Sequence, residues 1–393
     1  MIQGVTMRTI FRAFFSLFLV VIIWINTSAT ILAEDETDLK LYARSAILVD
    51  AGTGRILYEE NGFEVMPMAS TTKIMTCILA LESGKTEEWV TVSRNAQGQP
   101  KVRLGFKEGE SYCLKDLLYS LMLESHNDTA VAIAEFVGGS VEGFADMMNA
   151  KAVELGCENT YFITPNGLDA TKDGKQHSST AYDMALITAY ALENEEFRKI
   201  ISTPSHSFME KSKTKQYTVY NKDAFLNMYE GAIGVKTGFT NGAGYCFVGA
   251  VERGDAQFVS VVLASGWPPN KSWKWADTKT LMNYGTENYF YTTYMGEAQY
   301  GPVAIRDGVA ESVSVEVKRE EIGLLLRKDE CIVTEYEVVT DIQAPVEEGQ
   351  IVGCERYVLD DEILAEFPIV TVEKVDKITL WYCLGKIVEK IFI

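Results

Sequence analysis

Two β-type blocks that enclose a long helical stretch constrain the fold of this chain more than any other feature of its sequence. Residues 46–58 alternate apolar side chains around a turn at residues 51–54 and predict a β-hairpin. A second block predicts three strands, at residues 231–238, 244–251 and 258–264. Strands that flank a helical middle indicate an α+β domain, in which an antiparallel sheet packs with a cluster of helices.

The stretch between the two blocks is mostly of helical pattern. Apolar residues at helical spacing, together with glycine stops, predict helices over about residues 70–81, 129–137, 141–155 and 181–192. Ser70 is expected to cap the first of these helices. A fifth helix is expected near Trp275, with its end at Gly285.

The composition changes after about residue 295, which indicates a second domain. Short β-like runs between turn residues occur at residues 303–305, 312–317, 331–338 and 369–372. With 393 residues, the chain exceeds the usual size of a single domain. We therefore expect a larger domain over residues 34–290 and a small all-β domain over residues 291–375.

The C-terminal residues, 376–393, form one amphipathic stretch. Seven apolar residues fall on one side of a helix: Leu380, Trp381, Leu384, Ile387, Val388, Ile391 and Phe392. Because the stretch is too short and too charged to span a bilayer, we expect a helix that lies in the membrane interface as an anchor. A helix packed on the β domain is the alternative, since amphipathicity alone does not choose between the two.

The N-terminus has the pattern of a secretory signal peptide at residues 1–33. Arg8 and Arg12 precede an apolar run, residues 13–25, and small residues follow before an acidic stretch. An uncleaved anchor is the alternative, but the run is shorter than the roughly 20 residues of a spanning helix. Together with the C-terminal helix, this pattern predicts a protein secreted across the cytoplasmic membrane and held on its outer face.

Charge and cysteine content disfavour several kinds of partner and site. The formal net charge is −19, and an acidic surface repels phosphates, so nucleic acid is not an expected partner. Seven cysteines are scattered singly, without the paired spacing of a zinc site or a disulfide framework. One disulfide, between Cys331 and Cys354, remains an option. We expect no metal and no organic cofactor.

Three short motifs carry groups that could act together in nucleophilic catalysis: Ser70-Thr71-Thr72-Lys73, Ser125-His126-Asn127 and Lys236-Thr237-Gly238. In the first motif, residues three apart share one helical face, so the Lys73 amine can reach the Ser70 hydroxyl. A lysine can act as the base for that hydroxyl only when burial or a nearby cation lowers its pKa. Lys236 could supply the nearby cation.

The other two motifs supply proton transfer and substrate binding. Ser125 can pass a proton between the lysine and a leaving amine, and Asn127 can hold a substrate amide. The third motif is expected on a strand edge, where Gly238 lets a substrate backbone lie close. Lys236 and Thr237 can bind a carboxylate. Each motif alone is weak evidence, whereas the order and local setting of all three indicate one shared site.

The motifs resemble those of the penicillin-recognising serine enzymes, a group that includes penicillin-binding proteins and serine β-lactamases. Four stretches are similar to the low-molecular-mass D-alanyl-D-alanine carboxypeptidases within this group: residues 67–76, 121–128, 165–169 and 234–238. The resemblance covers roughly residues 40–375. It implies a β-lactamase/transpeptidase-like catalytic domain, then a small β domain and a C-terminal amphipathic anchor.

The resemblance also implies a role for each motif residue. Ser70 would form the acyl-enzyme, with Lys73 as the general base and Ser125 as the proton shuttle. The substrate-binding residues would be Asn127, Lys236, Thr237, Gly238 and Phe239. The backbone N–H groups of Ser70 and Phe239 would form the oxyanion hole.

The implied activity is removal of the terminal D-alanine from peptidoglycan pentapeptides. The expected partners are therefore peptidoglycan stem peptides and, as covalent inhibitors, β-lactam antibiotics. A DD-endopeptidase shares this chemistry, and a serine β-lactamase or a non-catalytic wall-binding protein shares the fold. An E-x-x-L-N pattern, which supplies the deacylating glutamate of class A β-lactamases, is not found between the second and third motifs. Three histidines and no G-x-S-x-G elbow disfavour a Ser-His-Asp hydrolase.

Two positions depart from the family pattern. The middle residue of the second motif is His126, where many relatives carry glycine. We expect a solvent-facing side chain there, because the relay needs no imidazole; the alternative is an imidazole that alters substrate fit or titrates near neutral pH. Gln257 is expected at the position of an arginine that helps hold the carboxylate in some relatives. Carboxylate binding would then depend on Lys236 and Thr237 alone, or on another cation.

Overall fold

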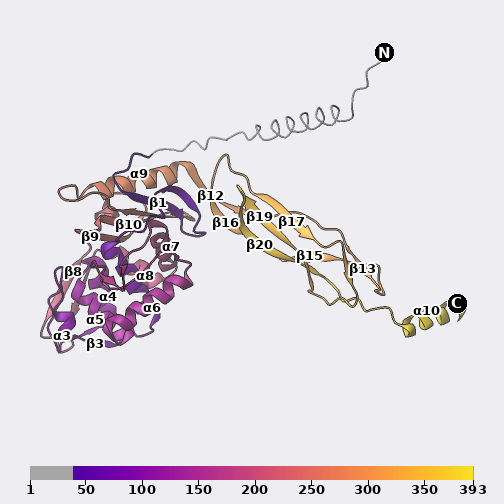
Figure 1. The fold of residues 1–393 in the computed structure, drawn as a ribbon, viewed down its shortest axis with the longest axis horizontal. Helices are drawn as coiled ribbons and strands as arrows, with labels where there is room; N and C mark the ends of the chain where they lie inside the picture. Colours follow the sequence, from indigo (N-terminus) through magenta and orange to yellow (C-terminus); the bar gives the residue numbers. More distant parts are fainter. Residues whose placement is uncertain (1–38, 393) are drawn as a thin grey trace, which may run out of the picture. The chain divides into compact units, whose positions relative to one another are not determined.

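The computed structural model describes residues 39–392. The predicted signal peptide and the last residue lie outside this range. Within the described range, helices and strands combine in the α+β arrangement that the sequence predicts, and an all-β region follows the larger domain along the chain (Figure 1). The predicted fold class is therefore confirmed.

The larger domain is built on a five-stranded antiparallel sheet with the strand order β2-β1-β11-β10-β9. Its strands are β1 (Ser45–Asp50), β2 (Ile56–Glu60), β9 (Ala232–Thr240), β10 (Gly244–Arg253) and β11 (Ala256–Leu263). The hairpin predicted at residues 46–58 is β1–β2. Because β9 ends the strand order, one of its edges is not paired within the sheet.

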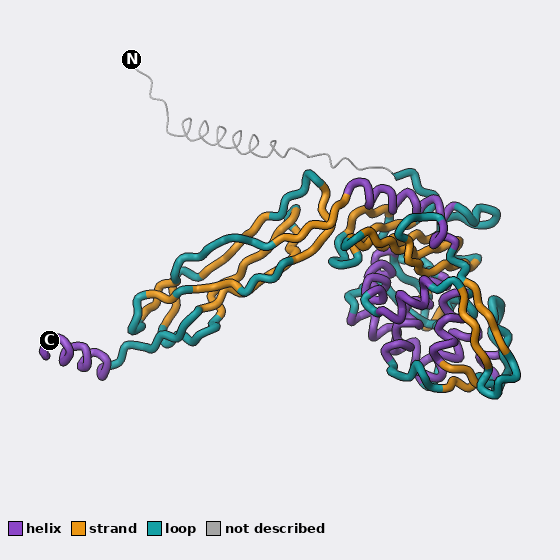
Figure 2. The backbone as a smooth tube through the Cα atoms, turned by 180° about the vertical axis from the view of Figure 1, so that it is seen from behind, coloured by secondary structure: helices purple, strands orange, loops and turns teal. Residues whose placement is uncertain are grey.

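Helices cover both faces of this sheet (Figure 2). α9 (Trp273–Asn288) packs on one face, against β1, β10 and β11, and the helical cluster packs on the other. The expected end of α9 at Gly285 is wrong, because the helix continues to Asn288. A Cβ at Gly285 would lie 2.8 Å from Cδ2 of Leu48, so this glycine allows the helix to approach the sheet closely.

The helical cluster consists of α2 (Lys73–Glu82), α4 (Leu114–Leu123), α5 (Asn127–Gly138), α6 (Val141–Glu154), α7 (Ala181–Leu192) and α8 (Glu195–Ser202). Four of them, α2, α5, α6 and α7, confirm the predicted helices, with shifts of up to three residues at their ends, whereas α4 and α8 are additional. Ser70 does not cap α2, which corrects that expectation. A 3₁₀ turn, η1 (Ala69–Thr72), precedes the helix, and Ser70 lies on this turn.

Shorter elements join the helices of the cluster. Three two-stranded sheets pair β3 (Trp89–Thr91) with β4 (Ser111–Cys113), β5 (Thr171–Lys172) with β6 (Lys175–Gln176), and β7 (Ser205–Met209) with β8 (Gln216–Tyr220). Two short helices, α3 (Arg94–Gln97) and η2 (Ala224–Asn227), complete the set. A large core of buried apolar side chains lies between the sheet and the cluster, and it fixes η1 and α2 in place.

The all-β region contains three sheets. β12 (Tyr289–Tyr294) pairs with β16 (Ile322–Arg327), and a second sheet has the order β14 (Ser312–Val313), β13 (Val303–Arg306), β18 (Asp341–Gln343). The third has the order β15 (Val315–Val317), β20 (Glu362–Thr371), β19 (Ile351–Leu359), β17 (Val333–Val338). Two small apolar clusters form its core, so this region has a hydrophobic interior of its own.

The optional disulfide between Cys331 and Cys354 is not formed, because the strand register separates the two residues. β17 pairs with β19 so that Cys354 lies opposite Glu337, whereas Val333, two residues after Cys331, lies opposite Val358. The two cysteines therefore lie toward opposite ends of the strand pair, beyond the reach of a disulfide. All seven cysteines of the chain lie among the described residues and are free thiols.

The C-terminal helix, α10 (Leu380–Phe392), exposes its apolar side chains. Leu380 is 74% exposed, Trp381 81% and Ile391 69%. In the structure, these side chains are therefore not buried against the β domain. Among the described residues, no helix is both long enough and apolar enough to cross a bilayer.

Candidate active site

The three sequence motifs meet at one place in the larger domain. Ser70 lies on η1, Ser125 lies in the link between α4 and α5, and Lys236 lies on the edge strand β9, which packs against η1. Lys73 connects the first two motifs, because its Nζ lies 2.9 Å from Oγ of Ser70 and 3.0 Å from Oδ1 of Asn127. Residues that are far apart in the sequence thus form one site.

Lys73 is completely buried, and burial changes its protonation. Burial lowers the pKa of its amine well below the usual 10.5, and the charge of Lys236 lowers it further. Nζ has three partners: Oγ of Ser70, Oδ1 of Asn127 and, at 2.6 Å, the carbonyl oxygen of Asn166. A neutral amine has two hydrogens for the two carbonyl oxygens and one lone pair for the hydroxyl. This set of partners fits a lysine that accepts the Ser70 proton.

Asn166, which no motif marks as a site residue, completes the surroundings of the lysine. Its carbonyl oxygen also lies 3.3 Å from Oγ of Ser70. The next residue, Gly167, has a φ of 80°, and a Cβ there would lie 1.9 Å from the carbonyl oxygen of Ala69. Only glycine fits so close to the backbone that precedes the nucleophile. The turn sequence around Asn166 is the available signal, but a backbone carbonyl leaves no side-chain pattern.

Ser125 has an uncommon backbone conformation. Its φ is 66°, in the left-handed region that residues other than glycine rarely adopt. Its Oγ is buried and has no hydrogen-bond partner within the described range. Leaving a buried hydroxyl unpaired costs about 1–3 kcal/mol, so such a group calls for a functional explanation. The predicted shuttle is present as an unpaired hydroxyl, and it is not hydrogen-bonded to Lys73.

Asn127 ties the lysine to a neighbouring loop. Its Oδ1 accepts from Lys73, and its Nδ2 donates to the carbonyl oxygen of Lys101 at 3.1 Å. Its backbone N–H donates to the carbonyl oxygen of Val102 at 2.8 Å. The sequence predicts that this amide binds substrate. The structure adds that the same amide holds the lysine in place.

The edge strand approaches the nucleophile at Gly238. A Cβ on this residue would lie 3.0 Å from the backbone N of Ser70 and 3.1 Å from the carbonyl oxygen of Met68. The next residue, Phe239, is 38% exposed. The two N–H groups predicted to form an oxyanion hole, those of Ser70 and Phe239, therefore lie on two segments in close contact.

Lys236 is a second buried amine, and two further charges lie near it. Burial lowers the pKa of Lys236 to about 7, Asp223 opposes this shift, and Lys274 adds to it. Burial raises the pKa of Asp223 to about 7 and lowers that of Lys274 to about 8. We call Lys236, Asp223 and Lys274 the charge cluster. The motifs mark only the first of the three residues.

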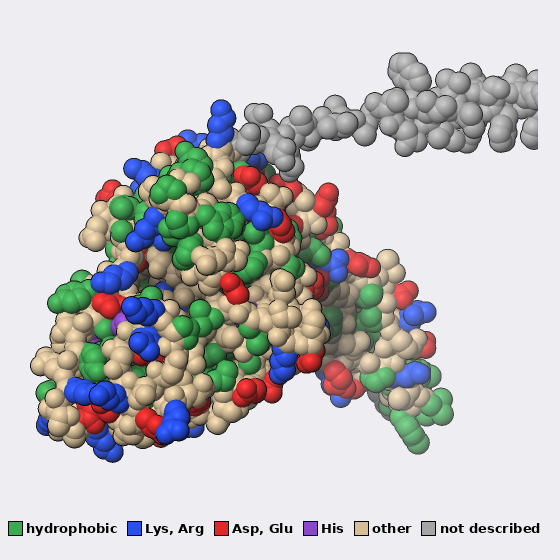
Figure 3. All heavy atoms as spheres, turned by 60° about the vertical axis from the view of Figure 1, so that its left-hand side comes forward, with side chains coloured by type: hydrophobic (Ala, Val, Ile, Leu, Met, Phe, Trp, Pro, Cys, Tyr) green, Lys and Arg blue, Asp and Glu red, His purple; other side chains and the backbone are tan. Residues whose placement is uncertain are grey.

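The site depends on buried charges rather than on a charged surface. On the face drawn in Figure 3, Lys and Arg side chains are intermixed with Asp and Glu side chains. In contrast, the three lysines of the site are at most 3% exposed: Lys73, Lys236 and Lys274. The net charge of the chain therefore says little about this site.

Gln257 lies away from the site, which corrects the expectation that it takes the arginine position. In the β10–β11 register it lies opposite Glu252, and its Nε2 donates to the Glu252 carboxylate at 2.8 Å. Val262 is the β11 residue that lines up with Thr237 across the sheet. The additional cation near the third motif is Lys274 of α9.

His126 is buried, which corrects the expectation of a solvent-facing side chain. It is 4% exposed, and burial lowers its pKa below the usual 6.5. Its Nδ1 lies 2.8 Å from Oγ of Ser120, and its Nε2 lies 3.3 Å from Oε2 of Glu124. The expectation failed because the imidazole has partners in α4 and at its end, which the motif does not signal.

His177 supports η1 from outside the catalytic group. Its Nδ1 accepts from the backbone N–H of Ile163 at 2.9 Å, so the ring proton is on Nε2 and faces Oγ1 of Thr72, also at 2.9 Å. Burial lowers the pKa of His177 to about 3, which keeps the ring neutral. Thr72 in turn donates to the carbonyl oxygen of Ala69. His177 thus stabilises the turn that carries the nucleophile.

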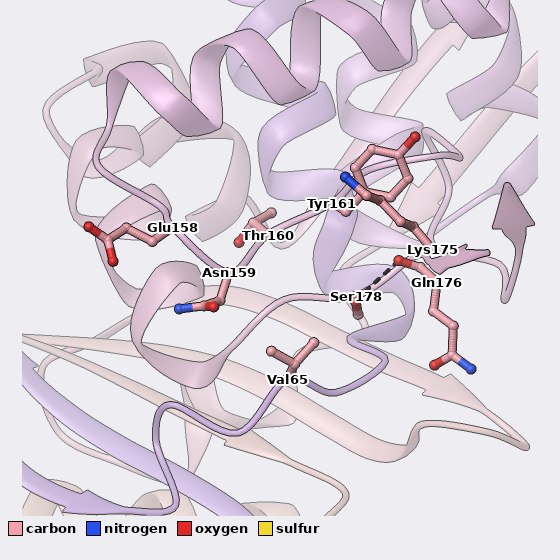
Figure 4. A pocket seen from close by; sticks show the side chains of 8 residues that line it. All are labelled: Val65, Glu158, Asn159, Thr160, Tyr161, Lys175, Gln176 and Ser178. Atoms are coloured by element: carbon pink, nitrogen blue, oxygen red, sulfur yellow. Dashed lines mark hydrogen bonds between the residues drawn. The ribbon is translucent and has the colours of Figure 1, made fainter. Parts of the chain in front are cut away.

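Two cavities of about 350 Å³ each lie along the segment between α6 and α7. Figure 4 shows the first, which Asn159 and Val65 help to line and where the Lys175 side chain of β6 lies over the ring of Tyr161. The second is lined by Asp169 and Gly242, among others. Neither lining includes a predicted site residue, so these cavities of the described chain add no member to the site.

Comparisons with known proteins agree with this organisation. A family model described as D-alanyl-D-alanine carboxypeptidase matches residues 31–266, and one described as the C-terminal domain of penicillin-binding protein 5 matches residues 293–377. The D-alanyl-D-alanine carboxypeptidase DacF of Bacillus subtilis is 31% identical over 350 residues, which cover 87% of this chain and 88% of the relative. DacC of Escherichia coli is 30% identical over 354 residues, which cover 85% and 84%.

Solved structures show the same similarity in three dimensions. Penicillin-binding protein 5 from Haemophilus influenzae matches with a TM-score of 0.70 and 26% identity, over 86% of this chain and 98% of that chain. Penicillin-binding protein D2 from Listeria monocytogenes, in its ampicillin-bound form, matches with a TM-score of 0.56 and 31% identity, over 63% and 99%. The transpeptidase-like domain followed by a β domain is thereby confirmed. This chain belongs to the D-alanyl-D-alanine carboxypeptidase family, the low-molecular-mass penicillin-binding proteins.

Proposed function

We propose that this chain is a serine carboxypeptidase that releases the terminal D-alanine of peptidoglycan pentapeptides through an acyl-enzyme on Ser70. The observation that carries the proposal is the 2.9 Å contact between the fully buried amine of Lys73 and the Ser70 hydroxyl. A lysine whose pKa is lowered by burial can remove the serine proton near neutral pH. The names of the relatives support the substrate class.

In the acylation step, Lys73 takes the proton of Ser70 while Oγ attacks the carbonyl carbon of the D-Ala–D-Ala bond. Negative charge develops on the carbonyl oxygen, where the N–H groups of Ser70 and Phe239 would donate hydrogen bonds. Ser125 passes a proton from Lys73 to the leaving nitrogen, the C–N bond breaks, and D-alanine departs. The unpaired hydroxyl of Ser125 is available for this transfer.

In the deacylation step, water attacks the ester carbon and gives one proton to Lys73. A proton then returns from Lys73 to Oγ of Ser70 as the ester C–O bond breaks. The loop residue that contacts both Ser70 and Lys73 is Asn166, which offers a carbonyl oxygen and no carboxylate. An amide oxygen is a far weaker base than a carboxylate, so the hydrolysis of a penicilloyl ester is expected to be slow. This feature favours a penicillin-sensitive carboxypeptidase over a β-lactamase.

The terminal carboxylate of the substrate would lie at Thr237, with positive charge from Lys236 and Lys274. Both lysines are buried, and their pKa values are about 7 and about 8. A bound carboxylate would therefore stabilise their charged forms. The substrate main chain would pair with the free edge of β9, where Gly238 leaves room for it.

Mass spectrometry after incubation with penicillin tests this proposal. We expect one penicilloyl adduct on the Ser70 peptide, its loss in Ser70→Ala, and D-alanine release from a pentapeptide by the untreated enzyme. A chain without adduct and without D-alanine release would be a non-catalytic wall-binding protein. Rapid nitrocefin turnover would indicate a β-lactamase, and faster cleavage of a cross-linked dimer than of the pentapeptide would indicate an endopeptidase.

We also propose that the enzyme is exported and acts on the outer face of the cytoplasmic membrane, held there by α10. The N-terminal pattern and the exposed apolar residues of α10 support this location. Deletion of residues 376–393 should release the mature protein into the soluble fraction, whereas Lys386→Gln, on the polar side of α10, should leave it attached. Attachment of the deletion variant after signal-peptide removal would contradict the anchor.

A further inference from the structure

The link between α4 and α5 holds a buried imidazole that the mechanism above does not use. Ser125, with its φ of 66°, turns the chain, and the following side chain, that of His126, is only 4% exposed. The link therefore places a proton shuttle and a buried histidine next to each other in sequence. Their side chains have different surroundings: among the described residues, Oγ of Ser125 has no hydrogen-bond partner, whereas both ring nitrogens of His126 have partners.

The two partners of the imidazole lie in α4 and at its end. Nδ1 lies 2.8 Å from Oγ of Ser120 in α4, and Nε2 lies 3.3 Å from the carboxylate of Glu124, which caps the end of α4. Oγ of Ser120 also lies 3.0 Å from Oγ1 of Thr129 in α5. His126 therefore bridges the end of one helix and, through Ser120, reaches the start of the next.

These partners determine where the ring proton lies. A carboxylate only accepts, so Nε2 carries the hydrogen that faces Glu124. Burial keeps the ring neutral, and Nδ1 therefore accepts from the Ser120 hydroxyl. Ser120 in turn accepts from the Thr129 hydroxyl. Each group therefore donates its hydrogen to the next, in the order Thr129, Ser120, His126 and Glu124.

Glu124 is itself fixed from outside the two helices. Its Oε1 accepts from the backbone N–H of Tyr220 at 3.0 Å and lies 3.4 Å from Nζ of Lys222. The backbone N–H of Lys222 also donates to the carbonyl oxygen of Leu123 at 3.0 Å. The Glu124 carboxylate, which faces Nε2 of His126, is therefore held by the segment at the end of β8.

We propose that His126 is a positioning residue for Ser125: its imidazole, held between Ser120 and Glu124, keeps the link in the left-handed conformation that sets where the Ser125 hydroxyl lies. A positive φ is disfavoured for serine, so it persists only where surrounding contacts over-determine it. The imidazole provides such contacts one residue along the chain. This inference rests on the proposed function, in which Ser125 moves the proton to the leaving amine.

A double-mutant cycle of His126 and Ser125 tests the inference. In the presence of Ser125, His126→Gly should lower the rate constant of acylation by penicillin by about tenfold to a hundredfold, because orientation is lost. For a pentapeptide substrate, kcat should fall with little change in KM. In the Ser125→Ala background, the same substitution should have little further effect. An equal loss in both backgrounds would show that His126 does not act through Ser125.

Two further variants sharpen the test. His126→Asn keeps an oxygen that can accept from Ser120 and should retain more of the rate than His126→Gly. His206→Asn changes a histidine that contacts Asp116 at 2.7 Å, away from the link, and should leave the rate unchanged. If thermal unfolding shows that His126→Gly does not fold, the cycle is measured with His126→Asn, and the same criterion decides.

The outcome also separates this inference from the proposed function. A wild-type chain that forms no penicilloyl adduct and releases no D-alanine would refute the proposed function. An active wild-type chain with equal losses in the two backgrounds would refute only the positioning role of His126.

Discussion

The β domain and the active site both bury charged side chains, but they compensate them to different degrees. In the β domain, the fully buried carboxylate of Glu355 accepts from Nε and Nη2 of Arg319 at 2.7 and 2.8 Å, and also from the hydroxyl of Tyr300. Burial by itself would raise the pKa of Glu355, but these hydrogen bonds outweigh it and lower the pKa. The carboxylate therefore stays ionised.

In the active site, the charge cluster is only partly compensated. The described residues offer Lys236 and Lys274 no carboxylate within 4.0 Å, and Oδ2 of Asp223 has no hydrogen-bond partner. Burial then dominates, and it moves the pKa of Lys236 down and that of Asp223 up, each to about 7. The comparison teaches that full pairing fixes a charge, whereas partial pairing brings protonation into the range where proton transfer occurs.

The largest expected effect on the acylation rate comes from replacing Lys73, the lysine whose positive charge the active site suppresses. Lys73→Arg places a guanidinium there, which does not lose its proton, so no base remains for Ser70. We expect the rate of acylation by penicillin to fall by about 10³-fold in mass-spectrometric time courses. The exposed Lys172→Arg is the matched control and should be unaffected. A Lys73→Arg rate near that of the wild type would show that the suppressed charge is not needed.

In the β domain, Arg319→Met should reduce stability without changing the chemistry. It leaves the Glu355 carboxylate buried and uncompensated, at a cost of about 3–5 kcal/mol. Urea unfolding should show the loss, and the acylation rate per folded molecule should stay constant. Arg319→Met combined with Glu355→Leu removes both charges and should recover most of the stability. A slower acylation of folded Arg319→Met would break the comparison, because the β domain would then take part in the reaction.

Gly238→Ala tests the contact between the edge strand and the nucleophile. The added Cβ would lie 3.0 Å from the backbone N of Ser70, so the strand or the turn must shift. A shift of a few tenths of an ångström to 1 Å at reacting groups can lower the acylation rate by about tenfold to a hundredfold. Gly301→Ala, where an added Cβ meets open space, is the control. Equal rates for both variants would contradict a close fit at Gly238.

The smallest expected effect is a shift in pH dependence from Asp223→Asn. Lys236 attracts a carboxylate only while it is charged, and its pKa of about 7 means that this charge is lost as the pH rises through neutrality. We therefore expect kcat/KM for a pentapeptide to fall on the alkaline side. Because Asp223 raises the pKa of Lys236, Asp223→Asn lowers it, and the fall should begin at lower pH. An unchanged alkaline limb would show that this limb does not report on Lys236.

Local sequence signals predict the elements that local chemistry determines. α7 begins after Thr180, whose side chain accepts from the backbone N–H of Asp183, and α5 ends before Gly139, which has a φ of 75°. Gly285 shows the limit of such signals. It lies inside α9, because the helix packs closely on a strand that is more than two hundred residues earlier in the sequence. A local pattern cannot distinguish a glycine that ends a helix from one that lets it pack.

The sequence predicts those residues of the active site whose positions in a motif follow a regular spacing along the chain. Lys73 contacts Ser70 because the two residues are three apart, one on the turn η1 and the other at the first position of α2. The carbonyl oxygen of Asn166 and the ammonium of Lys274 enter the site from other elements, and no spacing relates them to the motifs. His126 is buried next to a left-handed backbone angle at Ser125, and a serine in the sequence does not signal that angle.

Because β9 ends its sheet beside the nucleophile, the sheet is one strand short where the reaction would take place. A peptide that docks there is recognised first through its main chain, whose N–H and C=O groups repeat regardless of the side chains. Tolerance of varied stem peptides would then be a property of sheet geometry, and selectivity would rest on the D-configured end beside Gly238 and Ser70. A small rigid amide with the shape of an extended dipeptide could pair with the same edge through its amide groups. The unpaired edge of β9 is therefore also where a β-lactam antibiotic would bind.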